Sequence, residues 1–148
     1  MANKTFKFEG GRELDAALAK LPTATAKNVG RRVLKARAKP IRDDAEANAP
    51  SFTGRLQDDV KIGTRLTRRQ SAMNRRLGPE EVEVHVGVSD PAGLQTEYGN
   101  EHQPAEPWFR PAWDSNVSGA LRGIGEDMWT EISKSAKRLA RKAARMGS

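Results

Sequence analysis

The sequence predicts an α+β fold in which a small antiparallel sheet packs against N-terminal helices and one long C-terminal helix. Two stretches, residues 25–48 and 111–145, place apolar side chains at helical spacing. Between them, residues 81–88 (EVEVHVGV) alternate valine with polar residues or glycine, which is typical of a strand with one solvated face. The chain has 148 residues, the length of one domain, so we expect a single α+β domain over residues 1–148.

The N-terminal third is predicted to hold a short strand followed by two helices. Phe6 and Phe8 alternate around a lysine before two glycines, which indicates the strand. A first helix ends at Pro22 and carries three leucines at helical spacing: Leu14, Leu18 and Leu21. We expect the second helix, over residues 25–48, to kink or break at Pro40, because proline removes an amide donor.

The middle of the chain is predicted to form the sheet. A turn before the sheet is made by Pro50, Thr53, Gly54 and Leu56. Residues 56–66 alternate imperfectly and indicate a strand, which we expect to pair antiparallel with residues 81–88. Between the two strands, residues 65–79 are polar, basic and without periodicity, which predicts a mobile basic loop.

The last helix is predicted to begin near Pro111, since proline is tolerated in a first turn, where its missing amide would be unpaired. Its apolar stripe runs as far as Ala143. Three glycines weaken its front half by about 1 kcal/mol each relative to alanine, and they predict close packing against a neighbour or a bend: Gly119, Gly123 and Gly125. Residues 134–148 form a basic helix end or tail, which suits the negative end of a helix dipole.

Candidate catalytic and metal-binding residues are few. Without cysteine, the chain offers no thiolate nucleophile, disulfide or zinc–thiolate site. It contains no nucleophile elbow, phosphate-binding loop or dinucleotide-binding motif. Glu97, Glu101 and His102 would have to converge to hold a metal, which their loop spacing does not ensure. We therefore expect no enzymatic activity, no metal and no cofactor, and a metal-dependent nuclease that uses these three residues is the least favoured interpretation.

The positive charge of the chain is concentrated in two blocks. The formal net charge is +7, and neither residues 61–76 nor residues 134–145 contain an acid. Such surfaces attract polyanions, but they also suit an acidic protein neighbour or serve only as solvated faces. The residues predicted to contact a polyanion or an acidic partner are Arg65, Arg68, Arg69, Arg75, Arg76, Lys137, Arg138, Arg141 and Lys142.

Residues 105–113 (AEPWFRPAW) combine prolines, which fix the backbone, with large aromatic side chains and an arginine. Protein interfaces are enriched in such anchors. The predicted subunit-docking residues are Tyr98, Pro107, Trp108, Phe109, Arg110, Pro111 and Trp113. The alternative is that these aromatic side chains only attach the segment to the core of their own domain.

Four motifs occur in an order that resembles a known family. They are A-P-x-x-T-G-x-L at residues 49–56, V-G-V at residues 86–88, Y-G at residues 98–99 and P-W-x-R-P-A at residues 107–112. Their succession between two long helices resembles the tail-completion or neck protein family of lambda-like tailed bacteriophages. Asn100 departs from that family, in which threonine is more usual, and the basic segment 65–77 matches no part of its pattern.

The resemblance implies a non-enzymatic structural protein of the virion that forms or completes a ring at the head–tail junction. The implied partners are copies of itself, in a ring of six or twelve, together with head–tail connector, tail-terminator or tail-tube proteins. Packaged double-stranded DNA is a further expected partner of the basic surfaces. The chain has no apolar run of membrane-spanning length, so we expect assembly in the host cytoplasm and no membrane partner. The alternative function is sequence-nonspecific nucleic-acid binding by the basic loop and the C-terminal helix.

Overall fold

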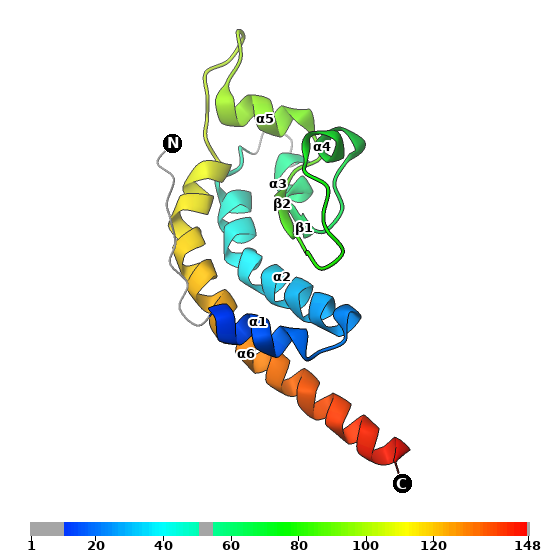
Figure 1. The fold of residues 1–148 in the computed structure, drawn as a ribbon. Coiled ribbons are helices and arrows are strands. Elements are labelled where there is room, and N and C mark those ends of the chain that lie inside the picture. The colour runs from blue at the N-terminus through cyan, green and yellow to red at the C-terminus, as the bar shows by residue number, and fades with distance from the viewer. Residues whose placement is uncertain (1–10, 51–54, 148) are drawn as a thin grey trace.

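The computed structural model describes residues 11–50 and 55–147, and it confirms the predicted α+β class (Figure 1). The predicted strand around Phe6 and Phe8 lies outside the described residues, as do Thr53 and Gly54 of the predicted turn. In chain order the elements are α1 (Gly11–Ala19), α2 (Thr23–Asn48), α3 (Arg55–Asp59), β1 (Lys61–Gly63), α4 (Arg68–Met73), β2 (His85–Gly87), α5 (Pro91–Tyr98) and α6 (Phe109–Met146).

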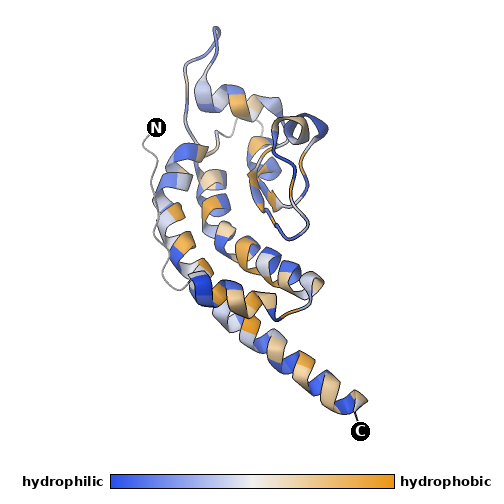
Figure 2. Ribbon diagram, in the orientation of Figure 1, coloured by the Kyte–Doolittle hydropathy of each residue, from blue (hydrophilic) through white to orange (hydrophobic). Residues whose placement is uncertain are grey.

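Helix α2 lies in the middle of the molecule, with the long helix α6 on one side and the two-stranded sheet on the other (Figure 1). Helix α1 packs against both long helices. Figure 2 shows that apolar residues recur along α2 and α6, separated by polar ones. The arrangement follows from these stripes, since each helix has to bury its apolar face against another element.

The hydrophobic core consists of two clusters, one toward each end of the α2–α6 pair. The first joins α1, α2 and the later part of α6 through Leu14, Val29, Val33, Met128 and Ile132. The second joins the end of α2, the residue before β1 and the beginning of α6 through Ala45, Ala49, Val60, Trp108 and Ala112. The long helices are thus fastened to each other at both ends of their contact.

The sheet is smaller than the sequence predicts. Strands β1 and β2 pair antiparallel, with Ile62 opposite Val86, which confirms the predicted pairing. The prediction of a strand over residues 56–66 is wrong in its first half, because Leu56 and Val60 are four residues apart and both pack on the second core cluster. That spacing suits one turn of a helix as well as a strand, and residues 55–59 form α3. Since β1 is three residues long, only three residues of the predicted second strand find partners.

Helices α4 and α5 are absent from the sequence prediction. Helix α4 lies within the predicted loop 65–79 and begins at a capping box, in which the Gln70 amide donates to Thr67 Oγ1 at 3.2 Å. Helix α5 begins at Asp90, whose carboxylate accepts a hydrogen bond from the Ala92 amide at 2.9 Å. Neither helix carries an apolar stripe that would predict it, and the mobility of residues 65–79 stays a prediction.

Both long helices are continuous. Helix α2 runs through Pro40, so the predicted break into two helices is wrong. In α6, a Cβ at Gly123 would overlap the guanidinium of Arg37, which pairs with Asp127 at 2.5 Å. This contact confirms close packing at Gly123, whereas a Cβ at Gly119 would meet nothing within 4 Å.

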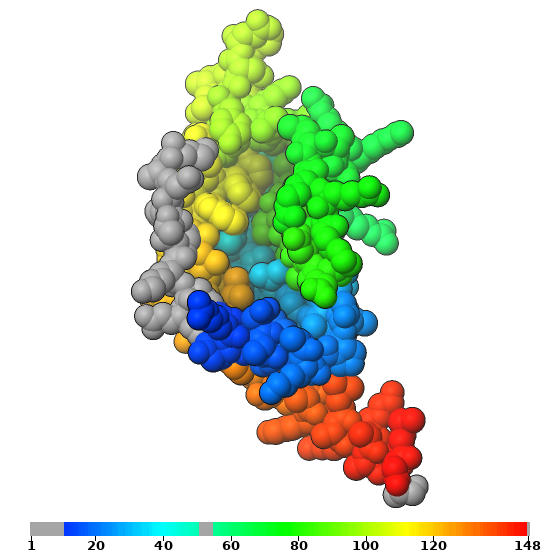
Figure 3. Space-filling view, in the orientation of Figure 1, coloured from blue at the N-terminus to red at the C-terminus, as the bar shows by residue number. Residues whose placement is uncertain are grey.

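The end of α6 extends beyond the rest of the molecule (Figure 3). Ser135 is its last buried residue, and we refer to residues 136–146 as the C-terminal arm. The arm has no acid and five basic residues: Lys137, Arg138, Arg141, Lys142 and Arg145. None of the helices in the described ranges is both long enough and apolar enough to cross a membrane.

Candidate functional site

The junction between α5 and α6 is organised by one buried carboxylate. Glu97, at the end of α5, accepts hydrogen bonds at Oε2 from the amides of Trp108 (2.7 Å) and Phe109 (2.8 Å). Its Oε1 accepts from the amide of Arg110 at 3.0 Å. A helix start leaves its first amides without partners inside the helix, and the next residue, Pro111, has no amide. A single side chain from another helix therefore satisfies the first turn of α6.

The environment of Glu97 keeps it ionised. Burial acts to raise the pKa of this carboxyl, but the amides of Phe109, Trp108 and Arg110 and the Arg110 guanidinium outweigh burial and hold the pKa below its ordinary value. The positive end of the α6 dipole favours the negative charge as well. Glu97 is therefore a fixed structural anchor, and its oxygens are already occupied by donors from its own chain.

Arg110 links this anchor to the surface. Its Nε donates to Glu97 Oε1 at 2.9 Å, and its terminal nitrogen donates to the Glu97 backbone carbonyl at 3.2 Å. The guanidinium also lies 4.8 Å from the centroid of the Tyr98 ring, within the range of a cation–π interaction. Because the Arg110 guanidinium is bound to both the carboxylate and the backbone carbonyl of Glu97, it offers the exposed Tyr98 ring a fixed contact.

Trp108 belongs to the core of its own chain. Its side chain is 3% exposed, and its indole Nε1 donates to the Gly93 carbonyl at 3.1 Å. Its backbone carbonyl accepts from Asn48 Nδ2 at 3.3 Å. Of the two interpretations of this aromatic segment, attachment to the core is the one that the position of Trp108 fits.

Trp113 and Tyr98, the latter on α5, lie at the surface, whereas Phe109 is half-buried against the second core cluster. The Phe109 ring meets Trp108 edge-on at 5.7 Å and stacks with Trp113 at 6.4 Å, measured between ring centroids. Trp113 is 44% exposed and Tyr98 is 55% exposed. We refer to Tyr98, Phe109 and Trp113 as the aromatic edge. A hollow of about 570 Å³ between α4, α5 and the start of α6 is lined by Tyr98, Phe109 and the exposed Leu94.

The remaining predicted docking and turn residues take up supporting positions. Pro107 and Pro111 are exposed on either side of the α6 start. Pro50 is half-buried, and Leu56 packs on the second core cluster. The Gln57 side chain of α3 donates to the Ala49 carbonyl at the end of α2 at 3.1 Å. The part of Pro107 and Pro111 in docking and that of Pro50 and Leu56 in a turn stay predictions.

The three candidate metal ligands do not converge. Glu97 faces the α6 amides, whereas Glu101 and His102 are more than four-fifths exposed and pair with each other at 3.1 Å. Asn100 Oδ1 fixes their turn by accepting from the amides of His102 and Gln103. No group of three potential metal-binding side chains occurs among residues 11–50 and 55–147.

The predicted basic residues lie in two separate regions. Arg65, Arg68, Arg69, Arg75 and Arg76 lie around α4, while Lys137, Arg138, Arg141 and Lys142 lie on the C-terminal arm. Arg75 is partly neutralised, since it pairs with Glu81 at 2.7 Å and lowers the pKa of that carboxyl. The others of this set are exposed or line open hollows.

Sequence reasoning missed the anchoring role of Glu97. The signal was indirect: Trp108 stands at the N-cap of α6, where its side chain supplies no acceptor for the first amides. A buried helix start without its own cap requires an acceptor from elsewhere in the chain. Which carboxylate supplies it depends on the position of α5, which the sequence did not predict.

One comparison with known proteins identifies a family. A family model described as "Bacteriophage HK97-gp10, putative tail-component" matches residues 12–99, which is more than half of the chain. The match covers α1 to α5 and ends two residues after the Glu97 anchor. Neither the comparison with curated proteins nor that with solved structures found a match.

Proposed function

The chain belongs to the HK97-gp10-like family of bacteriophage tail components, and from this premise we propose that it is a non-enzymatic subunit of a ring that forms or completes the head–tail junction. As a tail component it is a structural protein of the virion. The proposal adds the ring of six or twelve copies, the position at the neck and the contacts with connector, tail-terminator or tail-tube proteins.

The aromatic edge carries the proposal. Protein interfaces place large aromatic side chains at their centre, where the side chains can be fully desolvated. In the single chain, Trp113 and Tyr98 are about half exposed, although the junction of α5 and α6 beside them is held together by the hydrogen bonds of Glu97 to Trp108 and Arg110. A preorganised surface loses little conformational entropy on binding. The edge therefore suits a permanent contact with another subunit.

A ring requires two different faces on each subunit, because the contact between neighbours is head-to-tail. Helix α5 and the start of α6, which carry the aromatic edge, lie in one half of the molecule, and the basic C-terminal arm lies at the opposite end (Figure 1). Two chemically distinct ends support a heterologous contact better than a self-complementary one.

The test is the mass of the assembly in solution, measured by light scattering at low and moderate salt. We expect the wild-type chain to form a closed ring and Trp113→Ala to reduce its mass while the subunit stays folded. Trp129→Ala is the matched control, since Trp129 is 41% exposed and lies sixteen residues along the same helix, which is about 160° around its axis. Equal loss of assembly in both variants, or a wild-type chain that stays monomeric under all conditions, would contradict the proposal.

A further inference from the structure

A basic hollow lies between α2 and α6, away from the aromatic edge. It has a volume of about 520 Å³ and contains Arg31, Arg32 and Lys35 from α2 and Arg138 from α6, together with the polar side chains of Asn28 and Ser135. None of its lining residues is acidic or apolar. Only Arg138 belongs to the basic residues that the charge pattern of the sequence singles out.

Most of this charge is not neutralised by the chain itself. Arg32 lies 3.4 Å from Glu131, and Arg31 makes only a long hydrogen bond of 3.5 Å to Asn28. Within residues 11–50 and 55–147, neither Lys35 nor Arg138 forms an ion pair. The hollow therefore concentrates positive potential at a concave surface, where an anion can contact several cations at once.

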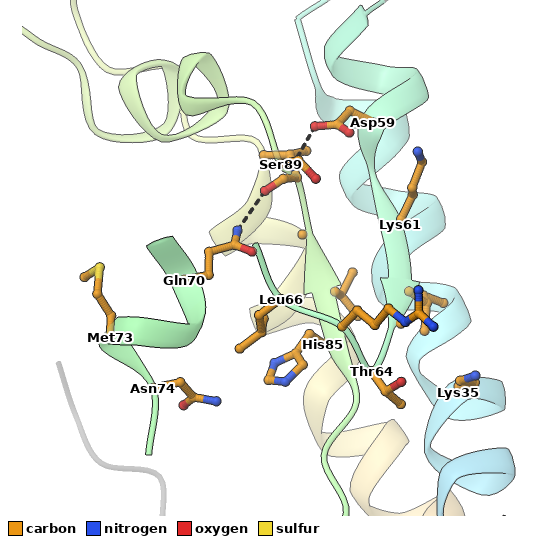
Figure 4. A pocket seen from close by; sticks show the side chains of 16 residues that line it. Lys35, Asp59, Lys61, Thr64, Leu66, Gln70, Met73, Asn74, His85 and Ser89 are labelled. Carbon is orange, nitrogen blue, oxygen red and sulfur yellow. Dashed lines mark hydrogen bonds between the residues drawn. The ribbon is translucent and has the colours of Figure 1, made fainter. Parts of the chain in front are cut away.

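A second hollow borders the first at Lys35. It has a volume of about 670 Å³ between the sheet and α4, and Lys35 lines both hollows. In Figure 4, Lys35 of α2 and Lys61 of β1 lie along the same side of this second hollow, which Arg65 also lines. Its one carboxylate, Asp59, accepts hydrogen bonds from the backbone amides of Ser89 and Asp90 at 2.6 and 2.9 Å. The carboxylate is thus directed at its own chain.

The positive surface extends from the first hollow along the C-terminal arm. Arg141, Lys142 and Arg145 follow Arg138 at intervals of three, four and seven residues, which places them on the same side of α6. At 1.5 Å per residue, this row covers about 10 Å of helix. One strand of duplex DNA carries a phosphate for about every 3.4 Å of its axis, so the row spans several phosphates.

We propose that Arg31, Lys35 and Arg138 form the centre of a binding surface for the phosphodiester backbone of duplex DNA. Cores of protein interfaces are depleted in charge and rich in aromatic side chains, whereas the hollow between α2 and α6 is lined by basic and uncharged polar side chains alone. Contacts of this kind hold phosphates and carry no sequence information. The inference rests on charge and shape, and it does not require the ring.

The test is the binding of a fluorescein-labelled 30-base-pair duplex, followed by fluorescence anisotropy between 50 and 200 mM NaCl. Each phosphate contact contributes about −0.9 to the slope of log affinity against log salt concentration. We expect the triple variant Arg31→Gln/Lys35→Gln/Arg138→Gln to bind more weakly, with a slope shallower by about 2.7. Over this fourfold range of salt, the wild-type affinity should then fall about 40-fold more than that of the variant.

Arg122→Gln is the matched control, because Arg122 is exposed on α6 sixteen residues before Arg138, about 160° around the helix. It removes one positive charge outside the proposed surface, so it should keep the wild-type slope of log affinity against log salt concentration. Binding of the triple variant that equals this control would overturn the inference, and so would a wild-type chain that fails to bind the duplex at 50 mM NaCl. Polyglutamate that displaces the duplex at equal charge concentration would also overturn it, in favour of an acidic protein surface. The assembly mass of the triple variant reports separately on the ring.

Discussion

Glu97→Gln removes the charge that holds the first turn of α6 while keeping the size of the side chain. In the wild type, four donors converge on the two oxygens at 2.7–3.0 Å, namely the amides of Trp108, Phe109 and Arg110 and the Arg110 Nε. Glutamine keeps one acceptor oxygen. Its NH₂ group replaces the other oxygen and cannot accept the hydrogen bonds of the N–H donors that point at it. A hydrogen bond to a charged group contributes about 1.5–3 kcal/mol, so at the lower end of this range the loss of the two bonds at one oxygen should cost about 3 kcal/mol.

Thermal unfolding followed by circular dichroism measures this cost. For a domain of this size, each kcal/mol lowers Tm by about 2–4 °C, so Glu97→Gln should melt about 6–12 °C below the wild type. Glu101→Gln is the control, because that carboxylate is 83% exposed and pairs only with His102. If both variants melt at the same temperature, the carboxylate of Glu97 does not stabilise the start of α6 and the explanation of the junction is wrong.

The same carboxylate predicts a pH dependence. The pKa of Glu97 is lowered in the folded chain, so its contribution to stability is fully present above the pKa of an unfolded glutamate, about 4.3. It is lost as the pH falls from there through the lower folded pKa. The difference in free energy of unfolding between wild type and Glu97→Gln should therefore be constant near neutral pH and shrink in acid. A difference that grows on acidification would mean that the folded pKa is raised.

Three further substitutions test the packing, each by its midpoint of thermal unfolding. Trp108→Ala should lower stability by about 3–5 kcal/mol, because it empties a buried site; a variant that keeps the wild-type Tm but fails to assemble would make Trp108 a docking residue after all. Gly119→Ala should raise stability by about 1 kcal/mol, since a methyl group there meets open space in a helix. Gly93→Ala should lower it by about 1–3 kcal/mol, because its Cβ would overlap the Val88 side chain and lie 3.1 Å from Leu56 Cδ1. A loss at Gly119 or a gain at Gly93 would contradict these contacts.

The long helices and the antiparallel pair could be predicted because their signals are local. Stripes of apolar side chains and alternating valines are properties of the chain alone, and burial of Val29, Val33 and Ile132 follows from them. The region from Leu56 to Tyr98 could not be predicted in the same way, since its elements are three to eight residues long. In such short segments Leu56 and Val60 fit a helical turn as well as a strand, and their contacts decide which forms.

The candidate site shows the same limit. Trp108 and Trp113 are alike in hydropathy and lie five residues apart, yet one is 3% and the other 44% exposed. The difference arises from α5. The Gly93 carbonyl of this helix accepts a hydrogen bond from the Trp108 indole, and its Glu97 carboxylate accepts one from the Trp108 amide. The sequence therefore indicated an aromatic anchor but not which ring is buried, and it could not assign Glu97 a role before α5 was known.

The C-terminal arm connects stability with the proposed contacts of the protein. Beyond Ser135 no side chain of α6 is buried and only Leu139 is half-buried, so the arm gains little from tertiary packing. An isolated helix of about twelve residues is marginal in water, and like charges three or four residues apart weaken it further. Arg138, Arg141, Lys142 and Arg145 repel one another in this way in the free subunit. A polyanion that neutralises them removes this repulsion, so binding and helix formation in the arm should reinforce each other.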